Sequence, residues 1–181
     1  MNISPKKENP RRKQTISPEV AQLLVEQIPR ELHNHAIYRT FANFFALKGL
    51  TDLETYYIQR ADEEIDHHRW IVDRLNYCDV PFCYPSTPKV EEAFPEDEKE
   101  ACIFPFQRTV DLEIETTEWI YAIADAAKEE CDWETFYWLQ KTLIDEQNEE
   151  EATSRTALDI ACMEDASWIR KSKEILKLLK K

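Results

Sequence analysis

Apolar residues recur along this chain at intervals of three and four, the spacing that places side chains on one face of an α-helix. The pattern predicts four long helices followed by a shorter one. They are expected over 18–48, over 51 to about 77, from a start between 95 and 105 to about 127, from 133 to about 162, and over 167–179. The expected fold class is therefore all-α.

Local signals for helix ends support these boundaries. Ser17-Pro18-Glu19 is typical of an N-cap followed by a proline and an acidic residue in the first helical turn. Gly49, the only glycine, suits the left-handed end of the first helix, and 51–54 (TDLE) is predicted to be a capping box that starts the second. Because the turn between them is very short, these two helices are expected to be antiparallel neighbours.

The segment from Cys78 to about Pro95 is rich in proline and has no periodicity. About eighteen extended residues can span a helix on the order of 40 Å long, so this segment is expected to be a crossover along the length of the bundle. The shortage of glycine disfavours the tight turns of β-hairpins. The sequence therefore predicts a single domain over 17–181, with a four-helix bundle at about 18–162, one long crossover and a short fifth helix at the C-terminal end.

Each of the four long apolar stripes is interrupted by polar residues near its middle. The interrupting residues are Glu31, Glu64 with His67, Glu113, and Gln147 with Glu150. An ionised carboxylate in an apolar interior costs several kcal/mol unless it is paired or bound to a metal. Carboxylate oxygens with one imidazole suit iron, manganese or zinc, and four carboxylates are more than one ion needs. One glutamate that bridges two ions is the simplest arrangement, and Glu64, beside His67 on the same helix face, is the best candidate.

Composition narrows the classes of partner. The formal net charge of -13 argues against nucleic acid as a partner of the folded body, because phosphate binding depends on clustered Lys and Arg. No apolar run reaches about 18 residues and the N-terminus lacks an apolar signal region, so we expect no membrane association and a cytoplasmic location. The five cysteines show no C-x-x-C spacing and are interpreted as reduced thiols rather than as a zinc or redox motif.

Four segments surround the polar interruptions: 25–38 (VEQIPRELHNHAIY), 62–67 (DEEIDH), 106–113 (FQRTVDLE) and 146–151 (EQNEEE). Together they resemble the motifs of the bacterial non-haem ferritins, and the resemblance extends from about residue 18 to the end of the fourth helix. It implies that Glu31 and His67 are terminal ligands and that Glu64 bridges two iron ions. It also implies that Tyr38 hydrogen-bonds a carboxylate of the site, so Glu64 and Tyr38 are the expected catalytic residues.

The same resemblance implies two further positions for iron. The second ion of the ferroxidase centre would lie among Glu113, Gln147 and Glu150. A third, accessory ion would be held by the carboxylates of Glu63, Glu146, Glu149 and Glu150. Ile65 stands where a bacterioferritin-like chain would be expected to offer its haem methionine, so no haem is expected.

A protein of this resemblance would be a ferroxidase that oxidises Fe(II) to Fe(III), with dioxygen or hydrogen peroxide as the acceptor. It would store ferric mineral inside a homo-oligomeric cage of twenty-four subunits. Two other functions stay open: a di-iron carboxylate oxidase or peroxidase that forms no mineral, and a binding protein that holds DNA or another acidic partner. The second alternative would use the basic tail over residues 1–16, which is predicted to be disordered.

Overall fold

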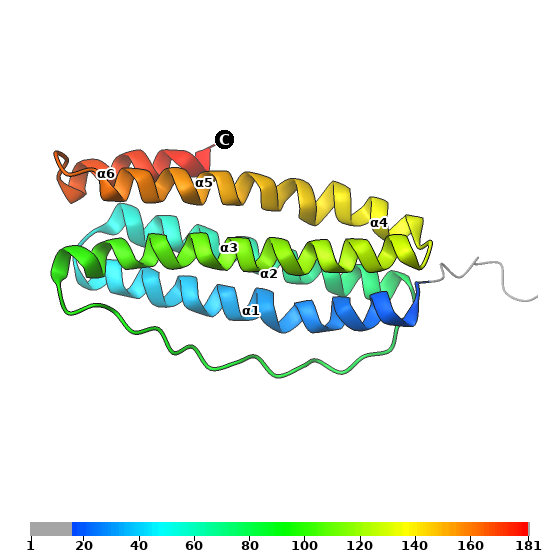
Figure 1. The fold of residues 1–181 in the computed structure, drawn as a ribbon. Coiled ribbons are helices and arrows are strands. Elements are labelled where there is room, and N and C mark those ends of the chain that lie inside the picture. The colour runs from blue at the N-terminus through cyan, green and yellow to red at the C-terminus, as the bar shows by residue number, and fades with distance from the viewer. Residues whose placement is uncertain (1–15, 181) are drawn as a thin grey trace, which may run out of the picture.

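Long helical stretches lie side by side and form the bundle shown in Figure 1. The computed structural model describes residues 16–180. Its elements are α1 (Pro18–Leu47), α2 (Thr51–Tyr77), α3 (Glu98–Glu129), α4 (Trp133–Leu139), the π-helical η1 (Gln140–Ile144), α5 (Asp145–Cys162), α6 (Trp168–Leu176) and the 3-10 helix η2 (Lys177–Lys180). The all-α prediction is confirmed, since the described part of the chain contains no strand. The predicted basic tail over 1–16 lies outside the described residues except for Ile16.

Side-chain caps begin most of the helices. Ser17 accepts a hydrogen bond from the backbone N–H of Val20, and Asp132 accepts one from the backbone N–H of Thr135, as N-caps do. The capping box expected at 51–54 is wrong, because the N-cap of α2 is Leu50, which has no side chain able to accept a bond. Gly49, with φ of 71°, instead turns the chain directly from α1 into α2.

The third helix begins within the expected window but extends around its proline. Asp97 caps α3 by accepting a hydrogen bond from the backbone N–H of Glu100 at 2.9 Å. Pro105 therefore lies in the interior of α3 rather than in its first turn. The hydroxyl of Thr109 donates to the carbonyl oxygen of Pro105 at 2.8 Å. A proline inside a helix removes one backbone hydrogen bond, and the surrounding core outweighs that loss here.

The buried side chains divide into two apolar clusters, one toward each end of the bundle. The first contains Phe41, Phe45, Tyr57 and Phe106 among its members, and the rings of Phe45 and Tyr57 stack with their centroids 5.6 Å apart. The members of the second cluster include Val20, Leu24, Ile28, Ile71, Leu75, Ile120, Ile123, Leu139 and Leu143. On every long helical stretch, the residues between the two clusters include buried polar side chains, and we call this zone the polar layer. Burial of each large apolar side chain contributes roughly 1.5–3 kcal/mol, which offsets the cost of the polar layer.

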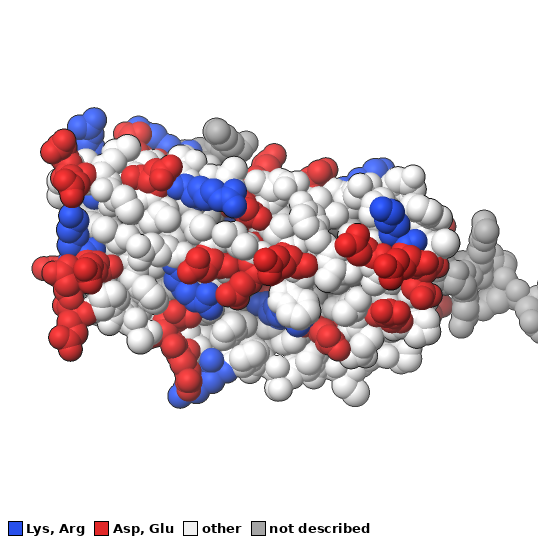
Figure 2. Space-filling view, viewed as in Figure 1, with Lys and Arg blue, Asp and Glu red and all other residues white. Residues whose placement is uncertain are grey.

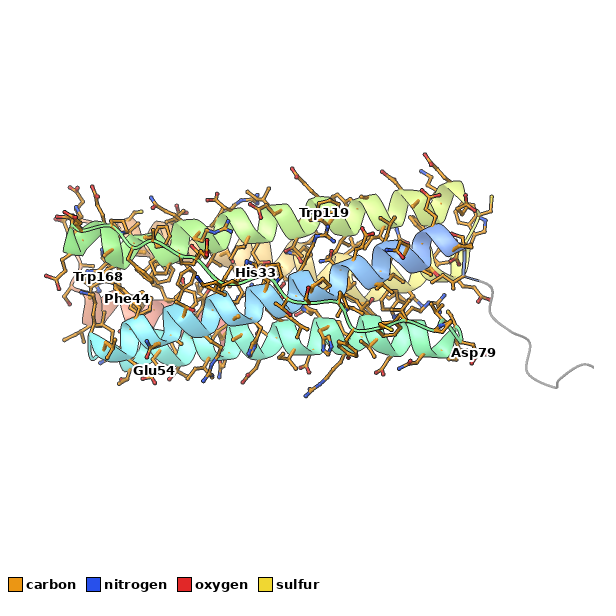
Figure 3. The ribbon with its side chains drawn as sticks, turned by 90° about the horizontal axis from the view of Figure 1, so that it is seen from below. His33, Phe44, Glu54, Asp79, Trp119 and Trp168 are labelled. Carbon is orange, nitrogen blue, oxygen red and sulfur yellow. The ribbon has the colours of Figure 1, made fainter. Side chains whose placement is uncertain are left out.

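The crossover between α2 and α3 contains no helix over residues 78–95 and runs outside the bundle beside α1, as expected (Figure 1). Seen from the crossover side, the chain leaves the end of α2 at Asp79 and passes the middle of α1, where His33 lies (Figure 3). Pro85 and Pro88 of the crossover line an open groove with His33 and Trp119. The crossover thus covers the outer face of α1 and α3 and leaves the polar layer enclosed by helices.

Acidic side chains are spread along the face shown in Figure 2 and gather at the end of the bundle where α3 starts. This distribution agrees with the formal net charge of -13. Among the described residues, no helix combines the length and the apolar character needed to span a membrane.

Candidate metal centre

The polar layer contains the residues that interrupt the four apolar stripes. The side chains concerned are almost fully enclosed, with exposed fractions of 0% for Glu31, 1% for Glu64, 3% for His67, 0% for Glu113, 3% for Gln147 and 4% for Glu150. They come from α1, α2, α3 and α5, so the layer exists only when all four stretches pack together. Such a concentration of buried charge calls for internal cations, protons or a bound metal.

One group in this layer has the geometry of a cation site. Glu31, Glu64 and His67 each offer a ligand atom, and these atoms lie within 4.8 Å of one another. The Nδ1 atom of His67 is 3.9 Å from Oε2 of Glu31 and 3.6 Å from Oε2 of Glu64, too far for good hydrogen bonds. Both carboxylate oxygens are buried and have no hydrogen-bond partner among the described residues. A divalent cation would satisfy both of them at once.

Burial and neighbouring negative charge determine the protonation of this group. Burial raises the pKa of Glu31 well above its ordinary value, and the neighbouring Glu64 carboxylate raises it further. Burial also raises the pKa of Glu64, as do the charges of Glu113 and Glu150. The group therefore retains protons at a pH where exposed carboxyls would lose them, and a metal ion would bind by displacing those protons.

A second group shares the same histidine. His67, Glu146 and Glu150 also offer ligand atoms within 4.8 Å of one another, and Nε2 of His67 is 3.7 Å from Oε1 of Glu150. Burial raises the pKa of Glu150 to about 7, although the nearby Arg60 and His67 lower it. Burial lowers the pKa of His67, but the nearby carboxylates, with Glu150 first, more than compensate, so its pKa lies above the ordinary value.

Arg60 is the charged residue of this layer that the sequence patterns did not single out. It lies on α2 with an exposed fraction of only 2%. Its guanidinium group donates to Oε1 of Glu113 at 2.5 Å, to Oε1 of Glu150 at 2.8 Å and to Oε2 of Glu63 at 2.8 Å. Burial lowers the pKa of Arg60, but the carboxylates of Glu150 and Glu113 outweigh this effect and raise it overall, so the guanidinium is charged.

The carboxylate of Glu113 is fully engaged by protein groups. Its Oε1 atom accepts a hydrogen bond from the Tyr38 hydroxyl at 2.5 Å as well as the bond from Arg60. Its Oε2 atom accepts a hydrogen bond from the side-chain amide of Gln147 at 2.6 Å. Burial, followed by the negative charge of Glu113, raises the pKa of Tyr38, so the tyrosine is a hydrogen-bond donor and not an anion. Tyr38 thus contacts a carboxylate of the layer, as the resemblance implies.

The residues expected at the accessory position are only partly gathered. Glu146 belongs to the second group with Glu150, and Glu63 reaches the same neighbourhood through Arg60. Glu149 is exposed on α5 and makes no hydrogen bond or ion pair with the residues that the structure describes. A place for Glu149 at an accessory ion therefore stays a prediction.

Two local features lie next to the site residues on their helices. The imidazole of His35 on α1 lies with Nδ1 2.7 Å from the carbonyl oxygen of Ala61 on α2, one turn from Glu64. The π-helical segment η1 ends at Ile144, immediately before the turn that contains Gln147. π-Helical turns inside α-helices are frequent at functional sites, where they change the direction of the residues that follow. The continuous fourth helix expected from the sequence is therefore interrupted at this point.

Comparison with known proteins extends this description. A family model described as "Ferritin-like domain" matches residues 21–163. The chain is 28% identical over 144 residues to the bacterial non-heme ferritin of Campylobacter jejuni, a match that covers 80% of this chain and 83% of that protein. It is 27% identical over 144 residues to the bacterial non-heme ferritin of Staphylococcus saprophyticus, with the same coverage of 80% and 83%.

Solved structures share the fold at lower identity. An engineered closed form of the Archaeoglobus fulgidus ferritin has a TM-score of 0.78 at 22% identity, covering 90% of this chain and 97% of that one. The open-pore ferritin of the same archaeon has a TM-score of 0.79 at 21% identity, covering 90% and 98%. At these identities the structural likeness supports the arrangement of helices alone.

Proposed function

This chain belongs to the ferritin-like family, and from that premise we propose that it is a ferroxidase that oxidises Fe(II) to Fe(III) and stores the ferric product. The reaction would take place in the polar layer, with Glu31, Glu64 and His67 as ligands of the ferrous substrate. Among curated proteins, the relatives with this likeness are named bacterial non-heme ferritins. Iron storage or ferroxidase activity is the general function that membership in this family supports.

The observation that carries the proposal is a pair of buried oxygens, Oε2 of Glu31 and Oε2 of Glu64, which have no hydrogen-bond partner within the described part of the chain and face Nδ1 of His67. A buried carboxylate oxygen without a hydrogen-bond donor costs free energy, and either a proton shared by the two carboxyls or a bound cation compensates for it. Two hard oxygen ligands and one imidazole suit ferrous iron, and the absence of thiolate ligands in this group disfavours soft metals.

The same ligands would drive the redox step. Anionic oxygen ligands stabilise Fe(III) more than Fe(II), because they neutralise the higher charge of the ferric ion. Each ferrous ion would lose one electron, so two ferrous ions with two protons would reduce one hydrogen peroxide to water, and four with four protons would reduce one dioxygen. Protons that Glu31 and Glu64 release when iron binds would be available for this reduction.

The ferric product would pass into a hollow homo-oligomer, for which we propose the twenty-four-subunit cage implied by the resemblance.

The proposed location is the cytoplasm, where a reducing environment matches the five free cysteines. The amphipathic helix α6 packs against α2 and α5 at one end of the bundle (Figure 1). This position leaves the polar layer at mid-length free of the C-terminal segment.

Ferrous oxidation at low iron loading tests the proposal. The metal-free chain would receive one Fe(II) per chain without oxygen and then be mixed with dioxygen or hydrogen peroxide, while ferric absorbance is followed by stopped flow. Rapid oxidation is expected for the unmodified chain and for Asp62→Ala, an exposed control on the same helix. Glu64→Ala should reduce the rate to that of free iron in buffer, and an unchanged rate in Glu64→Ala would refute the site.

A further inference from the structure

Arg60 occupies the part of the polar layer in which the resemblance implies a second iron. That ion would need oxygens of Glu113 and Glu150, and an oxygen of each already accepts a hydrogen bond from the guanidinium of Arg60, at 2.5 and 2.8 Å. Glu113 has no oxygen left over, since Oε2 accepts from Gln147. Among the described residues, the groups able to hold a cation include Glu31 and Glu150 but do not include Glu113.

The sum of charges in the layer points the same way. Glu31, Glu64, Glu113 and Glu150 can carry four negative charges, and they are enclosed with exposed fractions of at most 4%. The guanidinium of Arg60, which also binds Glu63, offsets part of this negative charge, so less of it remains to balance a second metal ion.

From these contacts we infer that Arg60 takes the place of the second metal ion, so that the centre holds one ion per chain, between Glu31, Glu64 and His67. The guanidinium is a permanent cation that holds the carboxylates of α3 and α5 at the distance a metal would otherwise set. Glu150, whose Oε2 atom has no hydrogen-bond partner among residues 16–180, lies with Oε1 3.7 Å from Nε2 of His67. This inference rests on the proposed function and restricts it to a mononuclear site.

Binding of Zn²⁺ alone tests the inference without any redox activity. Crystals of the metal-stripped full chain would be equilibrated with Zn²⁺, and anomalous scattering at the zinc edge would locate each ion, which separates the centre from the acidic surface. The variant is Arg60→Gln, which removes the charge and keeps a polar side chain. Arg74→Gln is the matched control, because Arg74 is also a buried arginine of α2 but contacts Thr135 outside the layer.

One Zn²⁺ in the centre is expected for the unmodified chain and for Arg74→Gln, and a second ion at Glu113 or Glu150 is expected for Arg60→Gln. The number of ions per centre would then double from one to two. Arg60→Lys keeps a cation and should hold one ion. If Arg60→Gln does not fold, a second ion in the centre of the unmodified chain or of Arg60→Lys would still contradict the inference.

Two results would overturn the inference while leaving the proposed function intact. The first is two ions in the centre of the unmodified chain, including an ion held by His67, Glu146 and Glu150. The second is a single ion in Arg60→Gln, which would mean that Arg60 is not what excludes the second metal. An unmodified chain with no Zn²⁺ at Glu31, Glu64 and His67 would overturn the proposed function and the inference together.

Discussion

The metal-free protein should lose stability as the pH rises, because its buried carboxyls hold protons more tightly than they do in the unfolded chain. Burial raises the pKa of Glu150 to about 7 from an ordinary value of 4.5. Between these two values the folded state binds more protons than the unfolded state, so the free energy of unfolding falls with pH. The contribution of Glu150 is complete below about pH 4.5 and is lost as the pH rises through about 7.

The magnitude follows from the difference between the folded and unfolded pKa values. One pKa unit corresponds to about 1.4 kcal/mol, so Glu150 alone should lower the free energy of unfolding by about 3 kcal/mol between pH 4.5 and pH 8. The pKa values of Glu31 and Glu64 are raised as well, which adds to the decrease. The raised pKa of His67 acts in the same direction, since its charged form is favoured in the folded state.

Urea denaturation in the presence of a chelator, at several pH values from 5 to 8, measures this dependence. The comparison is with Glu150→Gln, whose decrease should be smaller by about 3 kcal/mol, and with the exposed neighbour Glu149→Gln, whose decrease should match that of the unmodified chain. A free energy of unfolding that rises with pH, or equal slopes in the unmodified chain and Glu150→Gln, would contradict a raised pKa of Glu150 in the folded state.

Three further changes have defined outcomes. Glu149→Ala should leave the first rapid oxidation unchanged and slow only the later turnover of iron, as followed by ferric absorbance over repeated additions; loss of the first phase would contradict this. Asp132→Ala should lower the free energy of unfolding by about 1 kcal/mol through loss of the α4 cap, and denaturation that matches the unmodified chain would mean that the cap is not needed. Phe45→Ala, in the cluster beyond the polar layer, should cost roughly 3–5 kcal/mol, and a loss below about 1 kcal/mol would mean that the cluster repacks.

The bundle could be predicted from the sequence because its information is local. The spacing of apolar residues defined α2 over Thr51–Tyr77, and the Ser17 cap defined the start of α1. Capping and periodicity depend on neighbours within one or two helical turns, which the sequence displays directly. The same signals wrongly assigned the N-cap of α2 to Thr51. After the turn at Gly49, the residue in the N-cap position is Leu50.

Arg60 escaped prediction because its burial depends on distant partners. It follows Tyr57 by three residues and precedes Glu64 by four, at the edge of the apolar stripe, where an arginine ordinarily extends into solvent. Its partners Glu113 and Glu150 are 53 and 90 residues away in the sequence. The only local signal was the spacing of Arg60 from Tyr57 and Glu64. Its inward orientation depends on ion pairs with carboxylates of other helices.

The π-helical segment before Gln147 was missed for a related reason. An extra residue in a helical turn is stabilised by packing against neighbouring helices and has no sequence signature of its own. The buried positions Leu139, Leu143, Gln147 and Glu150 still lie on the inward face, as the apolar stripe predicted. The burial of these polar side chains was therefore readable from the sequence, whereas their hydrogen-bond partners required the structure.

The amount of iron retained per chain after aerobic loading with Fe(II), measured together with the native mass of the same sample, distinguishes iron storage from oxidation without storage. Many tens of iron ions per chain in a very large particle are expected, with Glu64→Ala slow to load. One to three ions per chain on a small oligomer would contradict iron storage and would support an oxidase that keeps the bundle but forms no mineral.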